Sequence, residues 1–189
     1  MTRKEQKEMR QKQILFKALE LFVTKGFTET KISDIAKALD ISVGLLFHYY
    51  ESKEQLCLEL VRMGAAFARK PQEMYQGPAL GYFSSTLDGL YRSVTEDPMV
   101  SYMFVLMSQA RRQGIPEEIR QTALAVDQMS FSAHLIEHGQ ADGSIKQGDP
   151  MALSFAFWCS VQGIMEQHLI TPDIPLPDKE WLLDIIRNK

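Results

Sequence analysis

The sequence has only two cysteines, Cys57 and Cys159, far apart in apolar segments. Such a pair makes neither a disulfide framework nor a metal-binding motif, so we expect two buried thiols. The chain also lacks any uninterrupted apolar run near the roughly 18 residues of a membrane span, and no signal-peptide stretch follows its charged start. We therefore expect a cytoplasmic protein that contacts no membrane, and we expect no cofactor.

Strand-like runs of β-branched residues with alternating polarity are missing too, whereas apolar positions recur three and four residues apart nearly throughout. This pattern predicts an all-α fold of about nine helices. The chain has 189 residues, of which 45% are hydrophobic, which is enough to bury a core. We expect an N-terminal three-helix unit in residues 1–53 and a C-terminal helical bundle in residues 54–189.

Capping and breaking residues set the expected helix boundaries. The first helix should run from Arg3 to Lys25 and end at Gly26, with a first dozen residues that are polar on every side. Thr30 is a candidate N-cap for a short second helix, a third is expected from Ser42 to about Tyr49, and a longer one from Ser52 to about Arg69. Five further helices are expected between breaks at Gly77-Pro78, Asp97-Pro98, Gly114 to Pro116, Gly139 to Gly148 and Thr171 to Pro177.

Charge is distributed unevenly along the chain. Residues 1–53 hold ten Lys or Arg and seven Asp or Glu, whereas the whole chain holds 21 and 24, so the N-terminal part carries +3 and the remainder −6. Such asymmetry suggests that only the N-terminal part meets an anion.

The stretch ISVGLLFHYYESKEQL, Ile41 to Leu56, holds four consecutive ring side chains that cannot all face one core. If the second and third helices cross closely at the small residue Ala36, Asp40 occupies the turn position that favours a left-handed backbone, which Asp tolerates. The side chains then expected inside are Leu39, Ile41, Leu46 and Tyr50, and those expected wholly or partly outside are Val43, Gly44, Leu45, Phe47, His48 and Tyr49. A solvated apolar and aromatic face of this length is typical of a docking surface.

The segment from Ile14 to Leu56 resembles the DNA-binding domain of the tetracycline-repressor (TetR) family of bacterial transcription regulators. The matching positions are Ala18, Leu21, Phe22, Gly26, Phe27, Thr30, Ile35, Ala36, Ile41, Ser42, Gly44, Leu46, Phe47, Tyr50, Lys53 and Leu56. The resemblance implies a homodimer that binds double-stranded DNA at a palindromic operator, associated with the bacterial nucleoid when DNA-bound. It also implies a repressor that a small apolar or aromatic effector releases from its operator.

The resemblance assigns roles within the motif. Its second helix, beginning at Ser42, would enter the major groove, where Gly44 allows close approach and Leu45 can meet a thymine methyl. The candidates for base edges are Val43, Leu45 and His48. The candidates for the DNA backbone are Thr30, Lys31, Ser42, Phe47, Tyr49 and Lys53, with the Tyr49 hydroxyl substituting for the one that Phe47 lacks.

The resemblance further implies an effector pocket inside the C-terminal bundle and a dimer made by the last two helices, about Pro150 to Leu169 and Asp178 to Arg187. The helix from Ser52 to Arg69 would link pocket and DNA. Pocket candidates are Met63, Phe67, Phe83, Leu87, Tyr91, Tyr102, Met103, Met107, Met129 and Gln162, for each of which plain core packing is the alternative. Interface candidates are Phe155, Trp158, Cys159, Gly163, Glu166, Trp181 and Ile185.

Two alternatives from other classes stay open. His134, Glu137 and His138 match an HxxEH zinc pattern, which would make the protein a metal-dependent hydrolase. Nothing in the motif supplies a third ligand, and His138 directly before Gly139 also suits a helix C-terminus, so we expect no enzyme. Alternatively, the exposed rings after Gly44 belong to a helical module that binds a protein.

Overall fold

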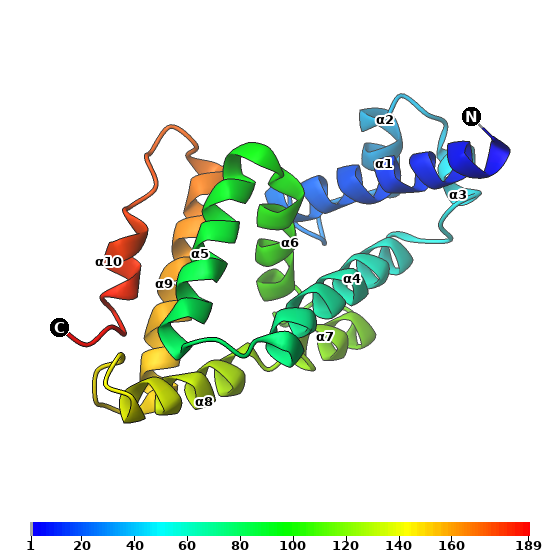
Figure 1. The fold of residues 1–189 in the computed structure, drawn as a ribbon. Helices are drawn as coiled ribbons and strands as arrows, with labels where there is room; N and C mark the ends of the chain where they lie inside the picture. The colour runs from blue at the N-terminus through cyan, green and yellow to red at the C-terminus, as the bar shows by residue number, and fades with distance from the viewer. Residues whose placement is uncertain (1) are drawn as a thin grey trace. The chain divides into compact units, whose positions relative to one another are not determined.

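A computed structural model describes residues 2–189, so Met1, the first residue of the predicted N-terminal domain, lies outside it; residues 70–74 are described by their backbone alone. In this part of the chain the fold is all-α, as predicted, with one isolated antiparallel bridge between Ile145 and Arg187. None of the helices described there has the length and apolar character needed to cross a bilayer. The helices (Figure 1) are α1 Arg3–Thr24, α2 Ile32–Ala38, α3 Val43–Phe47, α4 Lys53–Met74, α5 Ala79–Glu96, α6 Pro98–Gln109, α7 Glu117–Leu124, α8 Gln128–Ala141, α9 Pro150–Ile170 and α10 Lys179–Leu183.

The first helix begins and ends where its capping residues require. Thr2 and Glu5 form a capping box, in which the Thr2 hydroxyl accepts from Glu5 N and the Glu5 carboxylate accepts from Thr2 N. The left-handed backbone of Gly26, at φ 94°, ends the helix as predicted. Residues 3–12 are helical and mostly exposed, and the inward face is formed by Ile14, Leu15, Ala18, Leu19, Phe22 and Val23.

The chain divides into two compact units, and two of the boundaries between them fall inside α4 and α6. The first unit comprises the residues up to Ala66 together with Tyr102–Ala125, and the second comprises Phe67–Ser101 and Val126–Lys189. A functional boundary at residue 53 therefore stays a prediction.

Several predicted helix ends were wrong. The segment expected as one helix from Pro116 to His138 is two, because the Asp127 carboxylate accepts from Ser130 N and starts α8. At the other end, α8 continues through Gly139 to Ala141, and the positive φ falls on Gly143 instead. Elsewhere, α4 continues past Arg69 to Met74, and the last helix is shorter than expected, spanning only Lys179–Leu183.

The second unit has an aromatic core. α8 packs along α9, and α10 lies against α5 and α9 (Figure 1). The Phe83 ring lies 5.0 Å from that of Phe157, and Phe157 lies 5.1 Å from Trp158, both edge to face. At the edge of this core the Tyr91 hydroxyl donates to Pro177 O at 2.8 Å, which ties α5 to the loop before α10.

Candidate nucleic-acid interface

The turn between α2 and α3 has the geometry that the sequence predicted. Asp40 adopts φ 53°, the single positive φ among the described non-glycine residues, and Ile41 N donates to Ala36 O at 3.0 Å across the turn. Ala36 is buried, as close crossing of two short helices requires. The expected left-handed aspartate is confirmed.

The third helix is short, and its N-cap is the predicted one. The Ser42 hydroxyl accepts from Leu45 N at 3.1 Å, which leaves its O–H proton free to donate. The helix spans Val43–Phe47 rather than continuing to Tyr49, with His48 at its C-cap. Its first turn thus presents backbone N–H groups and one hydroxyl to the outside.

Burial separates the side chains of α3 into two sets. Leu46 and Tyr50 are inside, as predicted, and burial together with the neighbouring Glu59 raises the pKa of Tyr50 to about 12. Leu39 and Ile41 are only half-buried. We call the outward apolar residues the reading face; they are Val43, Leu45 and Phe47, at 39%, 40% and 49% exposure. Gly44 and His48 are also exposed, and Tyr49 is half-buried with its ring edge-on to His48.

A hollow of about 520 Å³ lies between α3 and the start of α1. It is lined by Leu45, His48 and Tyr49 from α3 and the turn after it, and by Arg3, Gln6, Lys7, Met9 and Arg10 from α1. The cations Arg3, Lys7 and Arg10, which we call the cationic face, were not among the predicted site residues. Their spacing of four and three residues along one helix is the signal that places them together.

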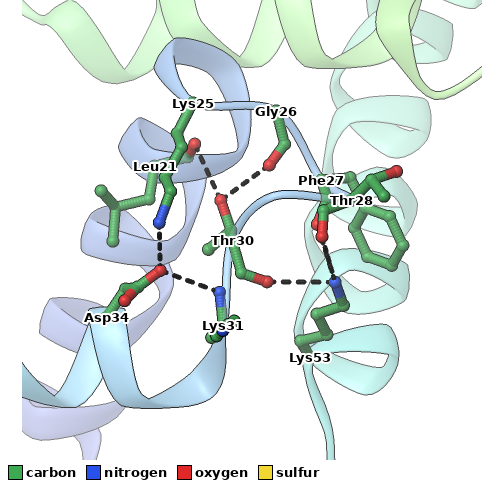
Figure 2. A network of polar contacts seen from close by, with 9 residues as sticks. All are labelled: Leu21, Lys25, Gly26, Phe27, Thr28, Thr30, Lys31, Asp34 and Lys53. Atoms are coloured by element: carbon green, nitrogen blue, oxygen red, sulfur yellow. Dashed lines mark hydrogen bonds and ion pairs between the residues drawn. The ribbon is translucent and has the colours of Figure 1, made fainter.

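Thr30 supports the fold from inside, which corrects two predictions. It is fully buried, and its hydroxyl lies 2.7 Å from Gly26 O and 3.2 Å from Leu21 O (Figure 2). It therefore neither caps α2 nor offers a hydroxyl to DNA. The residue in the cap position is Lys31, whose side chain is exposed and whose N–H donates to the Asp34 carboxylate at 3.1 Å.

Lys53 is also part of the fold rather than a free phosphate ligand. Figure 2 shows its ammonium group among the loop carbonyls of Phe27, Thr28 and Thr30, at 2.9, 3.2 and 3.0 Å. These partners use all three donors of an ammonium group, and the Phe27 ring lies 4.5 Å from the nitrogen. The predicted phosphate contact of Lys53 would therefore have to compete with these hydrogen bonds to the α1–α2 loop.

An ion pair fixes the other side of this loop. The Lys25 ammonium group binds the Asp34 carboxylate, which also accepts from Lys31 N (Figure 2). The hydrogen bond from Lys25 is the largest cause that lowers the pKa of Asp34 from its ordinary value, and the hydrogen bond from Lys31 N–H lowers it further. The start of α2 is thereby anchored to the end of α1.

The last long helix exposes an apolar stripe. Four exposed residues one turn apart form this α9 stripe: Met151, Phe155, Cys159 and Gly163. Phe155 is 61% exposed, and an exposed Cys159 corrects the expectation that both cysteines are buried. Trp181 is exposed, Glu166 and Ile185 are half-buried, and all of these stay candidates for the dimer interface.

Trp158 does not belong to such a surface. It is 5% exposed, and its indole N–H donates to the Ser132 hydroxyl at 2.7 Å within the second unit. Its assignment to the dimer interface was wrong because this hydrogen bond and the Phe83 and Phe157 rings hold it inside.

The predicted pocket residues are divided between the two units. In the first unit, Met63 is exposed, Met103 is buried, and Tyr102 and Met107 are half-buried. In the second unit, Phe83 and Leu87 are fully buried as core, Phe67 is 64% exposed, and Tyr91, Met129 and Gln162 are half-buried. These positions remain predictions for an effector.

A smaller hollow of about 250 Å³ lies in the first unit. It is lined by Phe22, Gly26, Phe27, Thr28, Glu29, Cys57, Leu106, Gln109, Ala110, Arg112, Gln113, Gly114 and Ile115. None of the predicted pocket residues is among them.

The HxxEH residues lie on the solvent side of α8. His134 Nδ1 is 3.2 Å from the Glu137 carboxylate, and His138 is exposed. Across the residues that the structure describes, no three His, Cys, Asp or Glu side chains are grouped to hold a metal ion.

The arrangement of α2, the Asp40 turn and α3 defines a helix-turn-helix DNA-binding protein. A family model described as "Bacterial regulatory proteins, tetR family" matches residues 14–60. Residues 14–60 thus form a DNA-binding segment of the TetR family, and curated relatives that resemble the chain are transcription regulators.

Individual relatives resemble the chain in sequence, and a solved structure resembles it in fold. The chain is 28% identical to the uncharacterized HTH-type transcriptional regulator YuxN of Bacillus subtilis (strain 168), over 85% of this chain and 54% of that one, so it spans about half of YuxN. It is 26% identical to the HTH-type transcriptional repressor KstR2 of Rhodococcus jostii (strain RHA1), over 88% of this chain and 85% of KstR2. The crystal structure of the MbdR regulator from Azoarcus sp. CIB has the same fold, with a TM-score of 0.78 at 19% identity, covering 92% of this chain and 95% of that one.

Proposed function

We propose that the protein is a homodimeric repressor that inserts α3 of each protomer into successive major grooves of a palindromic operator. The observation that carries the proposal is the reading face, whose apolar side chains are exposed beside the cationic face. A duplex offers matching groups to both, since thymine methyls lie in the major groove and phosphates border it. The name of the relative KstR2, a repressor, favours repression over activation.

Within this proposal the residues of the motif have distinct roles. Val43, Leu45 and His48 face base edges, and Gly44 permits close approach because it is exposed and carries no Cβ. The hydroxyl groups of Ser42 and Tyr49 donate to phosphates, Lys31 adds a charge, and the Phe47 ring lies against the sugar-phosphate backbone.

The dimer would form through the α9 stripe. Two copies of an exposed apolar helix face can pack against each other around a two-fold axis, and Gly163 allows the helices to approach closely. Dimerisation has a geometric reason, because two recognition helices must reach grooves about 34 to 36 Å apart.

The effector would be a small apolar or aromatic molecule bound in the second unit, whose core is rich in rings. If it binds a conformation in which the two α3 helices are spaced wrongly for DNA, it weakens operator affinity, and operator DNA weakens effector affinity by the same factor. α4 is the natural link, since it begins at Lys53 in the first unit and continues into the second.

In vitro selection from random duplexes tests this function. The wild-type protein should enrich two inverted half-sites with centres about 10 base pairs apart. The test variant is Gly44→Leu. Its added Cβ fits the fold, because the nearest atom is the Ser42 hydroxyl at 4.0 Å. This variant should enrich no sequence. Enrichment of the same site by both proteins would contradict the placement of α3, and failure of the wild type to enrich any site would contradict sequence-specific binding.

A further inference from the structure

The start of α1 carries its cations and its acids on different faces. Arg3, Lys7 and Arg10 follow one another at four and three residues, so they share one side of the helix. Glu5 is held in the capping box with Thr2 instead. Glu8 lies on the side of Lys4, 4.0 Å from its ammonium group. The cationic face is therefore free of acidic residues along its own helix.

The three cations have no anionic partner in the part of the chain that the structure describes. Within the described residues their side chains make no ion pair or hydrogen bond, and Arg3 and Lys7 are exposed while Arg10 is half-buried. Like charges one turn apart disfavour a helix. A surface that keeps them aligned and unpaired gains stability when an anion binds there.

This face lies beside α3. The Thr2–Glu5 capping box fixes the helix from its first turn, so the cations project from an ordered helix. They line the 520 Å³ hollow together with Leu45, His48 and Tyr49, within one compact unit. Whatever enters the hollow meets three cations on one wall and part of the proposed base-reading surface on the other.

We propose that the cationic face is a second DNA-contact surface, which receives the sugar-phosphate strand that borders the groove read by α3. This inference rests on the proposed function of α3. Lys7 and Arg10 bind consecutive phosphates from one side, and the Tyr49 hydroxyl binds from the other. Because phosphates carry no base information, the surface supplies affinity and orientation while α3 supplies sequence choice.

The test compares two double variants that remove the same charge. Lys7→Gln/Arg10→Gln removes two cations from the hollow, and Lys4→Gln/Lys12→Gln removes two exposed cations from outside it. Operator affinity is measured over a range of salt concentrations for both variants and the wild type. Circular dichroism checks that all three proteins keep their helix content and melting temperature.

Loss of each phosphate contact should lower the slope of log affinity against log salt by about 0.9. The hollow variant should therefore lose up to about 1.8 per protomer, with an unchanged ratio of operator to random-DNA affinity, while the control variant keeps the wild-type slope. Lys7→Arg/Arg10→Lys should restore the slope.

Equal slopes for the two double variants would overturn the inference, as would a loss confined to the operator with random-DNA binding unchanged. Failure of the proposed function looks different, since the wild type itself would then show no operator preference. Binding of an acidic protein or of free phosphate in the hollow, with no effect of Lys7→Gln/Arg10→Gln on DNA, would assign the surface to that other anion.

Discussion

Two helices of this protein present apolar side chains to solvent, in different surroundings. The reading face of α3 lies beside three cations of α1. The α9 stripe lies on a helix of 21 residues with no Lys or Arg and a single carboxylate, that of Glu166. An apolar face bordered by cations suits nucleic acid, whereas one on a nearly uncharged helix suits a second apolar face. The charges around an exposed face, more than its apolar content, therefore indicate its partner.

The largest expected effect is the difference in alkylation rate between the two cysteines. Burial raises the pKa of Cys57, on α4, to about 12, whereas Cys159 is exposed on the α9 stripe. Because alkylation requires an accessible thiolate, iodoacetamide at pH 8 should modify Cys159 much faster than Cys57 in protein dilute enough to be monomeric. Mass spectrometry of timed samples measures both rates. Raising the protein concentration should protect Cys159, and an unchanged rate would mean that the α9 stripe remains uncovered.

A charge placed on the stripe should break the proposed dimer. Phe155→Glu puts two carboxylates into one symmetric interface, and an unpaired buried charge costs about 3 to 5 kcal/mol. The dimer dissociation constant should rise at least about a hundredfold by analytical ultracentrifugation. Leu124→Glu, at another exposed apolar site on α7, is the control and should leave the constant unchanged. Equal dimer dissociation constants for the two variants would mean that α9 does not form the interface.

Lys53→Met tests whether Lys53 stabilises the fold, in contrast to the exposed cations of α1. It leaves three loop carbonyls without their donor, so the free energy of unfolding should fall by about 2 kcal/mol. Lys7→Gln should change it by less than about 0.5 kcal/mol because its side chain is exposed and unpaired. Urea unfolding measures both. If Lys53→Met kept full stability and lost only DNA affinity, the lysine would be a phosphate ligand after all.

One substitution at two glycines should have opposite effects. A Cβ at Gly139 would lie 2.6 Å from Ile145, so Gly139→Ala should lower the free energy of unfolding by about 1 to 2 kcal/mol. A Cβ at Gly163 meets nothing within 4 Å, so Gly163→Ala in the monomeric Phe155→Glu background should raise it by up to about 1 kcal/mol. Both are read by urea unfolding. A destabilised Gly163→Ala monomer would indicate contacts around α9 that the structure does not place there.

Local features of the fold could be predicted because single residue types fix them. Gly26 and Asp40 adopt the left-handed backbone that their positions required, Ser42 caps α3, and Leu46 and Tyr50 lie inside. The division of one predicted helix into α7 and α8 was missed. Asp127 has an ordinary helical sequence around it, and the break shows in its backbone, at φ −92° and ψ 73°, and in its bond to Ser130 N.

The partners of polar side chains could not be predicted in the same way. The sequence shows that Lys53 can bind an anion, but not that three carbonyls more than twenty residues earlier occupy its donors. Helical spacing likewise put Trp158 near the α9 surface, although Ser132 on α8 accepts its N–H inside the core. Both cases concern contacts between elements, which local periodicity does not encode.

The central claim is that α3 reads DNA sequence from a dimer. The most direct measurement is fluorescence anisotropy of the purified protein on the selected palindrome and on a scrambled duplex of equal length, each titrated with salt. We expect two protomers per palindrome, binding that weakens steeply with salt, and at least about a thousandfold preference for the palindrome. Equal affinity for both duplexes at every salt concentration would contradict it.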